Sequence, residues 1–298
     1  MRRTVMFTNI FAPLVGGVER SVATAHEDLN KTGDFCTLVT PRFRGDDNRE
    51  DRVLRVPAIT GLGRRGYSLP LPAFGRISRW MEAIRPTLVH AHQPFLLGGT
   101  ALRVARNRGI PLVFSHHTFY ERYAHYLPLD GTRARRALIR MTTAYANRPD
   151  LIIAPTPSVR EVLIERGVLV PIEVVPTGID TSLYSSGCRT RGRHRFGLSL
   201  DDEVVGHVGR LSQEKNLVYL VDAMVHLMRK RPSVRWLLAG DGDRLHWARR
   251  RVAEAGLAHR LLTPGTLLGA ATADASPSWI SSCLLLVLIP RASCSPKQ

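Results

Sequence analysis

The sequence predicts an α/β protein with two domains, each built around a parallel sheet. Short apolar and β-branched runs alternate with longer helical patterns from Thr4 onward, the alternation stops within Thr177–Leu200, and it starts again at Glu203. Such alternation indicates right-handed βαβ units around parallel sheets. The chain has 298 residues, 44% of them hydrophobic, which is enough for two cores of ordinary size.

The first series of elements defines the amino-terminal domain. Apolar and β-branched runs predict strands at Thr4–Asn9, Phe35–Thr40, Leu88–Ala91, Leu112–Ser115, Leu151–Ala154 and Glu173–Val175. Helical periods predict helices at Val18–Lys31, Leu97–Asn107, within Thr132–Asn147, and at Ser158–Arg166. Since the pattern is lost over Thr177–Leu200, we assign residues 1–180 to this domain.

The second series is shorter and defines a partial carboxy-terminal domain over residues 181–265. It predicts strands at Glu203–Val208, Val234–Ala239 and Arg260–Thr263, and helices at Asn216–Arg231 and Arg244–Ala255. A sheet commonly has about five or six strands, so three leave this domain incomplete. No regular pattern follows Gly265, and we expect residues 266–298 to form an aberrant, poorly structured tail.

Composition argues against several classes of protein. The formal net charge is +17, yet the sequence has no nucleic-acid-binding motif, so we expect no nucleic-acid partner. The four cysteines, Cys36, Cys188, Cys283 and Cys294, are far apart and have neither zinc-site spacing nor the density of a disulfide framework. We therefore expect a reducing compartment.

Neither end of the sequence predicts a membrane-crossing or targeting segment. The first apolar stretch is interrupted at Asn9 and Pro13, which makes it too short for a signal-peptide core. The apolar run Cys283–Ile289 is far shorter than the roughly 20 residues that span a bilayer. We expect a cytoplasmic protein, either soluble or peripheral at the inner face of the membrane.

Two glycines, Gly16 and Gly17, lie between the first predicted strand and the first predicted helix. Loops at this place bind ligands in α/β sheets, and the N–H groups that begin the helix favour an anion. A tight turn that requires positive φ explains the same pair. The residues alone leave both interpretations open.

Four histidines follow or end two predicted strands: His90 and His92 on one, His116 and His117 after the other. Their place at the carboxyl edge of the sheet favours hydrogen bonding to a ligand, with structural capping as the alternative. A metal site would need further ligands such as His125 or Asp130, which no spacing fixes, so we expect none.

The second series has a charged loop directly after its first strand. Arg210 and Lys215 would place two cations beside a helix N-terminus, which suits a diphosphate, although Glu214 could simply pair with a neighbour. At the end of the next strand, Gly240 and its neighbouring glycine would leave room for a ligand. Asp241 and the following aspartate are either part of that site or caps of a helix.

Together these motifs resemble the family 4 glycosyltransferases, which have the GT-B fold, retain anomeric configuration and use nucleotide-activated sugars. The resemblance covers residues 4 to about 265. It rests on Gly16–Arg20, Val89–His92, Gly109–Pro111, His116–Thr118, Pro176–Asp180, Gly209–Leu211, Glu214–Asn216 and Leu238–Gly242. It implies two Rossmann-like domains facing a cleft, with the acceptor on the amino-terminal side and the nucleotide-sugar donor on the other.

The resemblance also implies residue roles. His117 would hydrogen-bond the transferred sugar, and Arg210 and Lys215 would grip the donor diphosphate, which makes these three the catalytic residues. The donor-binding set is implied to be Gly16, Gly17, Arg210, Lys215, Gly240 and Asp241. Asp180 would be structural, and neither a cofactor nor a metal is implied beyond the nucleotide-sugar substrate.

Thr118–Tyr126 is similar to members of the family that glucosylate diacylglycerol or other lipid acceptors. The implied partners are a nucleotide-sugar, a lipid or sugar acceptor and the membrane surface. A basic region suits anionic lipid, although an ordinary helix on the sheet explains it equally well. In that region Arg64, Arg65, Arg76, Arg79 and Arg85 surround Leu69, Leu71, Phe74, Ile77 and Trp80.

One family feature is missing. Members carry a later Glu-x7-Glu motif that contacts the donor sugar and ribose, whereas here the last glutamate is Glu254 and Asp274 is the only acidic residue after it. A complete second domain would need roughly another 80 to 120 residues. We therefore expect either a glycosyltransferase or an inactive remnant, through truncation or an altered reading frame, that keeps acceptor or membrane binding.

Overall fold

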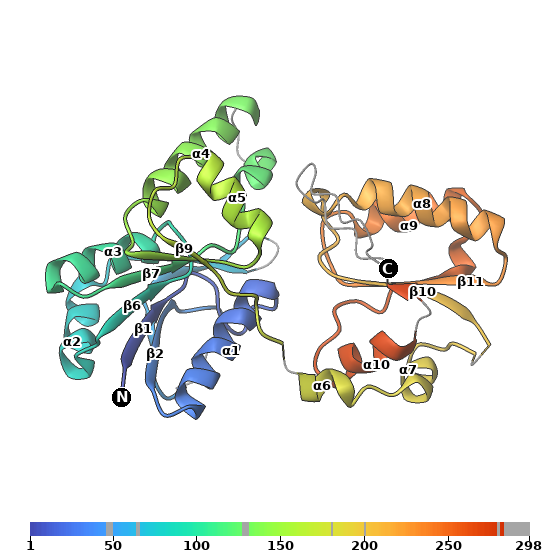
Figure 1. Ribbon diagram of the computed structural model, residues 1–298. Coiled ribbons are helices and arrows are strands. Elements are labelled where there is room, and N and C mark those ends of the chain that lie inside the picture. The colour runs from blue at the N-terminus through green and yellow to red at the C-terminus, as the bar shows by residue number, and fades with distance from the viewer. Residues whose placement is uncertain are drawn as a thin grey trace, which may run out of the picture. The chain divides into compact units, whose positions relative to one another are not determined.

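The computed structural model describes residues 1–45, 50–63, 66–126, 131–179, 181–199, 201–278 and 281–282. Contacts divide the chain into two compact units, Met1–Ile179 (unit 1) and Asp180–Gln298 (unit 2). Both units contain a parallel sheet with helices (Figure 1). The predicted α/β class is therefore confirmed.

Unit 1 is built on a seven-stranded sheet in the order β3-β2-β1-β6-β7-β8-β9, and its paired strands are parallel. The strands are β1 Arg3–Phe7, β2 Phe35–Pro41, β3 Val53–Val56, β6 Leu88–Ala91, β7 Leu112–Ser115, β8 Leu151–Ala154 and β9 Ile172–Val174. Val5 in β1 pairs with Thr37 on one side and Val89 on the other. All carboxyl ends therefore meet at one edge of the sheet.

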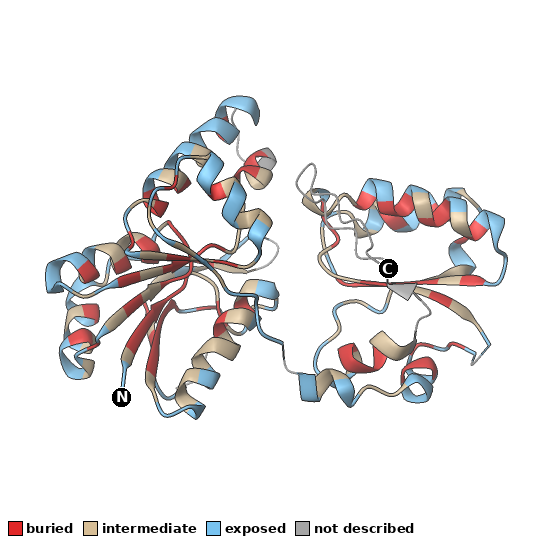
Figure 2. Cartoon of the chain, viewed as in Figure 1, coloured by how far each residue is buried: buried red, intermediate tan, exposed pale blue. Residues whose placement is uncertain are grey.

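Helices cover both faces of this sheet, because apolar side chains of β1 alternate between two cores. Val5 and Phe7 join the core under α2, α3, α4 and α5, whereas Met6 joins the core under α1. Figure 2 shows the strands buried and the outer faces of the helices exposed. The helices are α1 Gly17–Lys31, α2 Phe74–Ile84, α3 Leu97–Arg108, α4 Gly131–Ala146 and α5 Pro157–Glu165, with a 3-10 helix, η1, at Tyr120–Tyr126.

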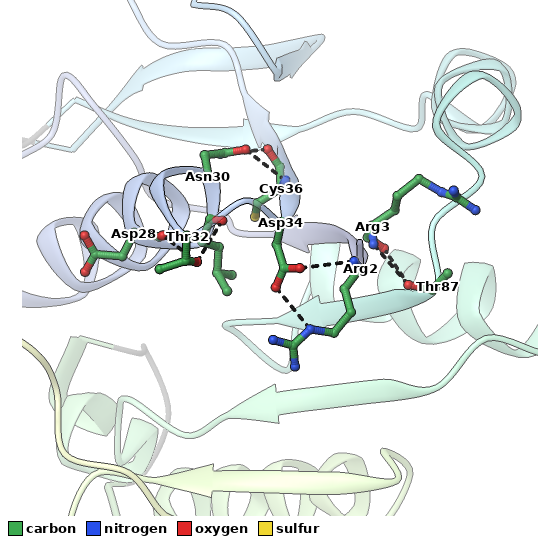
Figure 3. A network of polar contacts seen from close by, with 9 residues as sticks. Arg2, Arg3, Asp28, Asn30, Thr32, Asp34, Cys36 and Thr87 are labelled. Atoms are coloured by element: carbon green, nitrogen blue, oxygen red, sulfur yellow. Dashed lines mark hydrogen bonds and ion pairs between the residues drawn. The ribbon is translucent and has the colours of Figure 1, made fainter.

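A polar network fixes the far end of α1 to the sheet (Figure 3). The Asn30 side chain exchanges two 3.0 Å hydrogen bonds with the backbone of Cys36 at the start of β2. Asp34 accepts hydrogen bonds of 3.1 Å from both the backbone and the Nε of Arg2. These contacts hold α1 against β1 and β2, and thereby set the position of its whole length.

The region between β2 and β6 contains structure that the sequence pattern did not predict. Besides β3, it has the antiparallel pair β4 Ala58–Leu62 and β5 Tyr67–Pro70. Helix α2 buries Ile77 and Met81, so the interpretation as an ordinary helix packed on the sheet is correct for its inner face. Arg64 and Arg65 lie outside the described residues.

Unit 2 has a four-stranded parallel sheet in the order β12-β11-β10-β13. The strands are β10 Glu203–Val208, β11 Val234–Ala239, β12 Leu261–Leu262 and β13 Ser281–Ser282. The fully buried Trp236 lies in the core under α8 Leu217–Lys230 and α9 Leu245–Glu254. On the opposite face, Leu237 packs with Phe196 and Ala275 beneath α7 Arg189–Arg195 and α10 Ala270–Ser278.

Helix α10 and strand β13 correct the expectation that no regular element follows Gly265. A buried carboxylate ties α10 to α7, because Asp274 accepts hydrogen bonds from Arg191 Nε at 2.8 Å and from the backbone of Cys188 at 3.0 Å. The helix consists mainly of small residues without an apolar stripe and includes Pro277, which explains why its sequence shows no period. The tail from Cys283 to Gln298 lies outside the described residues.

Candidate functional site

The carboxyl edge of the unit 1 sheet is the expected place for a ligand. The strand order reverses on either side of β1, and open α/β sheets bind ligands at such a switch point. Asn9, just after β1, fixes the neighbouring loop: its backbone N–H donates to Gln93 Oε1 at 2.7 Å, and its Oδ1 accepts from Leu97 N at 3.1 Å. Sequence reasoning missed Asn9, because its partners are more than 80 residues away.

The Gly16-Gly17 loop begins α1 without a left-handed turn. Gly16 is the N-cap with an extended φ of −176°, and neither glycine has positive φ, so the interpretation as a positive-φ turn is wrong. A Cβ at Gly16 would lie 2.3 Å from Glu19 Oε2, whereas a Cβ at Gly17 would meet no atom within 4 Å. Gly16 thus makes room for the buried Glu19. A role of the pair in donor binding stays a prediction.

A pocket of about 230 Å³ lies beside these loops and is lined by all four histidines. We call it the histidine pocket. Helix α1 and the ends of β6 to β9 supply its walls: Ser21, Thr24, Ala25, Asp28, His90, His92, Ser115, His116, His117, Ile153, Pro155, Val175, Pro176, Thr177 and Gly178. The structure therefore brings together the four histidines that the sequence placed after two separate strands.

The histidines are joined by short contacts. His92 Nδ1 and His117 Nε2 are 2.9 Å apart and share a hydrogen bond, and their rings are stacked with centroids 5.2 Å apart. His90 Nε2 is 2.8 Å from Ser115 Oγ, and its ring centroid lies 4.2 Å from that of His92. The rings of His90, His92 and His117 therefore form a cluster, whereas the ring of His116 contacts Phe114 and Phe119.

Burial keeps the cluster uncharged. Desolvation is the main cause that lowers the pKa of His90 to about 3 and the pKa values of His116 and His117 to about 4. The same cause, with repulsion from His90 and His117, lowers the pKa of His92 well below its usual value. All four rings are therefore neutral at neutral pH.

The neutral state determines which way the His92–His117 hydrogen bond runs. In the described part of the chain, the buried Nε2 of His92 has no hydrogen-bond partner. A proton on that nitrogen would be a buried, unpaired donor, which costs more than a bare lone pair. His92 Nδ1 therefore donates to His117 Nε2, and His117 carries its own proton on Nδ1.

No metal site accompanies the cluster in the part of the chain that the structure describes. Its residues contain no group of three or more histidine, cysteine or acidic side chains arranged to hold an ion. The further ligands considered from the sequence, the His125 side chain and Asp130, lie outside the described residues. Hydrogen bonding to a ligand, with structural capping as the alternative, stays a prediction for these histidines.

The aromatic segment after β7 packs inward over its first residues. The ring centroids of Phe119 and His116 are 5.0 Å apart. Those of Tyr120 and Phe95 are 5.1 Å apart, in an edge-to-face contact. The buried Glu121 forms a 2.5 Å ion pair with Arg166, whose guanidinium lies 4.7 Å above the Phe119 ring. These residues brace the loop that carries His117.

In unit 2, the loop after β10 carries the predicted diphosphate-binding cations. Arg210 Nη1 lies 3.6 Å from Glu214 Oε1, and the Glu214 side chain is 3% exposed and also accepts a 2.6 Å hydrogen bond from Ser212. Lys215 ends the short 3-10 helix η2, Gln213–Lys215, just before α8. The pairing with Glu214 that the sequence left open is therefore present, and it holds the Arg210 side chain against its own loop.

The glycines after β11 have a packing role that the sequence did not predict. A Cβ on Gly240 would lie 1.8 Å from the backbone oxygen of Gly209, and one on Gly242 would lie 2.1 Å from that of Leu211. They allow the β11 loop to pack on the β10 loop, and a role of these glycines in donor binding stays a prediction. Asp241 accepts a 2.8 Å hydrogen bond from Gly242 N in its own turn and does not cap α9.

Comparison with known proteins gives the class and then the family. The sucrose-phosphate synthase of Thermosynechococcus elongatus superposes with a TM-score of 0.73 at 17% identity, covering 95% of this chain and 75% of that one. Anabaena Alr3699/HepE, solved with UDP and glucose, gives 0.69 at 18% identity, covering 95% and 73%. These similarities identify the fold as GT-B, as predicted.

Two family models match in consecutive order. Residues 15–183 match Glycosyltransferase Family 4, and residues 189–269 match Glycosyl transferases group 1. The first match covers more than half of the chain, so the chain belongs to Glycosyltransferase Family 4, a family of glycosyltransferase enzymes. The family assignment made from the motifs is thereby confirmed.

Curated relatives include lipid glycosyltransferases. An alpha-monoglucosyldiacylglycerol synthase of Streptococcus pneumoniae is 25% identical over 82% of this chain, and one of Acholeplasma laidlawii is 28% identical over 80%. A GDP-mannose-dependent alpha-mannosyltransferase of Mycobacterium tuberculosis is 29% identical over 80%. The matches cover 57% to 63% of the lengths of these three relatives.

Proposed function

We propose that this protein transfers a sugar from a nucleotide-sugar donor to a lipid or other glycoconjugate acceptor, with retention at the anomeric carbon. The family assignment supports sugar transfer, and the names of the diacylglycerol glucosyltransferases support a lipid acceptor. The nucleotide-sugar is the substrate and no cofactor is proposed. The observation that carries the proposal is Arg210, held by the buried Glu214 directly after β10.

The proposed chemistry assigns separate tasks to the predicted site residues. The bond between the anomeric carbon and the diphosphate oxygen breaks, and the acceptor hydroxyl oxygen bonds to that carbon on the same face. The acceptor proton leaves to the departing diphosphate or to solvent. Arg210 and Lys215 stabilise the negative charge that collects on the diphosphate, and their contribution grows as the bond breaks.

His117 completes this assignment from unit 1. With its proton on Nδ1, the ring donates a hydrogen bond to a hydroxyl of the transferred sugar, and its neutral state suits an uncharged partner. Gly16, Gly17, Gly240 and Asp241 keep the donor-binding role implied by the family, through backbone N–H groups or, at Asp241, a turn.

The proposal places the protein in the cytoplasm and peripherally at the inner face of the membrane. Helix α2 supports this location, because Phe74, Arg76 and Arg79 are all exposed on it. Exposed basic and apolar side chains suit anionic lipid. None of the helices that the structure describes has the length and apolar character needed to cross a bilayer.

A transfer assay tests the proposal. The purified chain is given UDP-, GDP- and ADP-sugars with diacylglycerol vesicles, and the glycolipid formed is measured. We expect transfer that Arg210→Ala and His117→Ala each reduce by at least about 100-fold, the effect of losing one electrostatic contact in a transition state. Arg229→Ala, an exposed arginine near the end of α8, is the matched control and should keep activity.

A second candidate function is binding without transfer. This candidate keeps acceptor or membrane-surface binding and lacks the transfer step. Nucleotide binding without product would support this candidate, whereas turnover of about 1 per second or faster would reject it.

A further inference from the structure

We propose that the histidine pocket binds an uncharged, hydroxyl-bearing group of the acceptor and discriminates against a phosphorylated one. The term acceptor rests on the proposed function, whereas the preference for uncharged groups rests on the pocket itself. The relatives of this chain include both diacylglycerol and inositol phosphate glycosyltransferases, so the two chemistries are real alternatives within the family.

The charge of the pocket walls disfavours a phosphate. Among the described residues that line the pocket there is neither a lysine nor an arginine, although the chain as a whole contains 42 of them. The one charged lining side chain is the exposed carboxylate of Asp28. A phosphate would therefore enter a partly buried site next to a like charge and without a cation, which is costly.

The histidines do not supply positive charge in place of lysine or arginine. The rings of His90 and His117 both lie against that of His92, and a proton on His92 is opposed both by burial and by these neighbours. A phosphate could gain a charged partner only by driving a proton onto this cluster. The energy of that protonation would be subtracted from its binding.

Arg166 is a cation that lies outside the pocket and acts on its histidines. Arg166 opposes the protonation of His116, so its positive charge reaches the pocket. Its guanidinium is held at 2.5 Å by the buried carboxylate of Glu121 and lies over the Phe119 ring. Arg166 does not line the pocket, and its guanidinium already pairs with Glu121, so an anion in the pocket would not contact it directly.

The hydrogen-bonding groups of the pocket walls match those of an alcohol. His117 offers the N–H donor on its Nδ1, and the hydroxyl groups of Ser21, Thr24 and Thr177 can each donate and accept hydrogen bonds. An alcohol also donates and accepts, so it can pair with these groups in either direction. A phosphate dianion accepts only and leaves acceptors such as the Asp28 carboxylate unmatched.

The test compares myo-inositol with its monophosphate, a pair that differs only in the phosphate. The imidazole signals of the folded full chain are followed by NMR at neutral pH while each probe is added. We expect inositol to shift the signals of His117 and His92, and the monophosphate to require at least about tenfold higher concentration, equivalent to 1.4 kcal/mol. Equal or better binding of the monophosphate, or no shift with either probe, would overturn the proposal.

Two matched substitutions on α1 locate the source of the preference. Asp28→Asn removes the carboxylate from the pocket wall, whereas Glu27→Gln removes the neighbouring one, which does not line the pocket and pairs with Lys31 at 3.5 Å. We expect Asp28→Asn to improve monophosphate binding about 2- to 5-fold and Glu27→Gln to leave it unchanged. Equal effects of the two variants would contradict the proposal.

These readouts are independent of catalysis. If the vesicle assay shows no transfer but inositol shifts the histidine signals, the proposed function fails and the preference of the pocket for uncharged groups stands. If transfer occurs and the monophosphate binds better than inositol, only the present inference fails.

Discussion

The two units place opposite chemistry at the same position of a parallel sheet. In unit 1 the ends of β6 and β7 bring four neutral histidines to one pocket, in which His92 and His117 share a hydrogen bond and the described lining residues include no lysine or arginine. In unit 2 the loop after β10 carries Arg210 and Lys215, with a buried glutamate beside the arginine. The sheet therefore supplies the location of a site, and the loop residues alone decide whether it suits a hydroxyl or an anion.

The units also differ in how their loops are held. Unit 1 uses side chains, such as Asn9 between β1 and α3, and the Glu121–Arg166 pair behind His117. Unit 2 uses backbone packed on backbone, which requires glycine at positions 240 and 242. The loop after β11 should therefore tolerate substitution less well than the loop before α1.

The largest expected effect is on the stability of unit 2. Gly240→Ala puts a methyl group 1.8 Å from the Gly209 oxygen at a φ of +139°, so we expect a loss of about 3 to 5 kcal/mol in the free energy of unfolding. Gly17→Ala, in open space inside α1, should change it by no more than about 1 kcal/mol. Urea unfolding followed by tryptophan fluorescence measures both.

Trp236 and Trp247 report on unit 2, and Trp80 reports on unit 1. A Gly240→Ala protein whose unit 2 signal unfolds at the wild-type urea concentration would show that the two loops do not pack as described.

The next effect is a loss of stability in acid that is specific to unit 1. In the folded protein the pKa values of His90, His116 and His117 are lowered to about 3 to 4. In the unfolded chain these histidines have their usual pKa of about 6.5, so between about pH 6.5 and 4 the unfolded chain binds protons that the folded protein does not. The free energy of unfolding is therefore constant above about pH 7 and falls as the pH drops toward 4. Each pKa unit corresponds to about 1.4 kcal/mol, so the total loss is on the order of several kcal/mol.

Urea unfolding at a series of pH values, read as the difference between the wild type and Trp80→Phe, measures this dependence for unit 1. The range above about pH 4.5 is decisive, since most carboxylates titrate below it. His116→Gln should reduce the slope, whereas His226→Gln, an exposed residue of α8, should not. A flat curve between pH 7 and 4.5 would contradict the neutral histidine cluster.

The sequence predicted the elements whose side chains are buried in regular patterns. The strands Leu88–Ala91 and Val234–Ala239 have the predicted bounds, because both are apolar runs buried within a sheet. The pair β4 and β5 was missed, since its residues are mostly half-buried or exposed and include glycine and proline. Helix α10 was missed because its packing depends on one buried carboxylate rather than on an apolar stripe.

For the site, residue types could be predicted but their environments could not. The motifs identified the histidines and Arg210, yet the hydrogen bond from His92 to His117 joins two strands that are far apart in the sequence. The requirement for glycine at 240 comes from the backbone of Gly209, which no local pattern indicates. The structure describes nothing of Asp180, so its predicted structural role stays a prediction.

The central claim is that unit 2 holds the donor diphosphate and unit 1 does not. Isothermal titration of the chain with UDP, GDP and ADP, which carry no sugar, tests it most directly. We predict that Arg210→Ala weakens the binding of the preferred diphosphate by about 1.5 to 3 kcal/mol, the range for a hydrogen bond to a charged group, and that His117→Gln and Arg229→Ala leave it unchanged. Equal affinity in Arg210→Ala and the wild type, or a loss of the same size in His117→Gln, would contradict the claim.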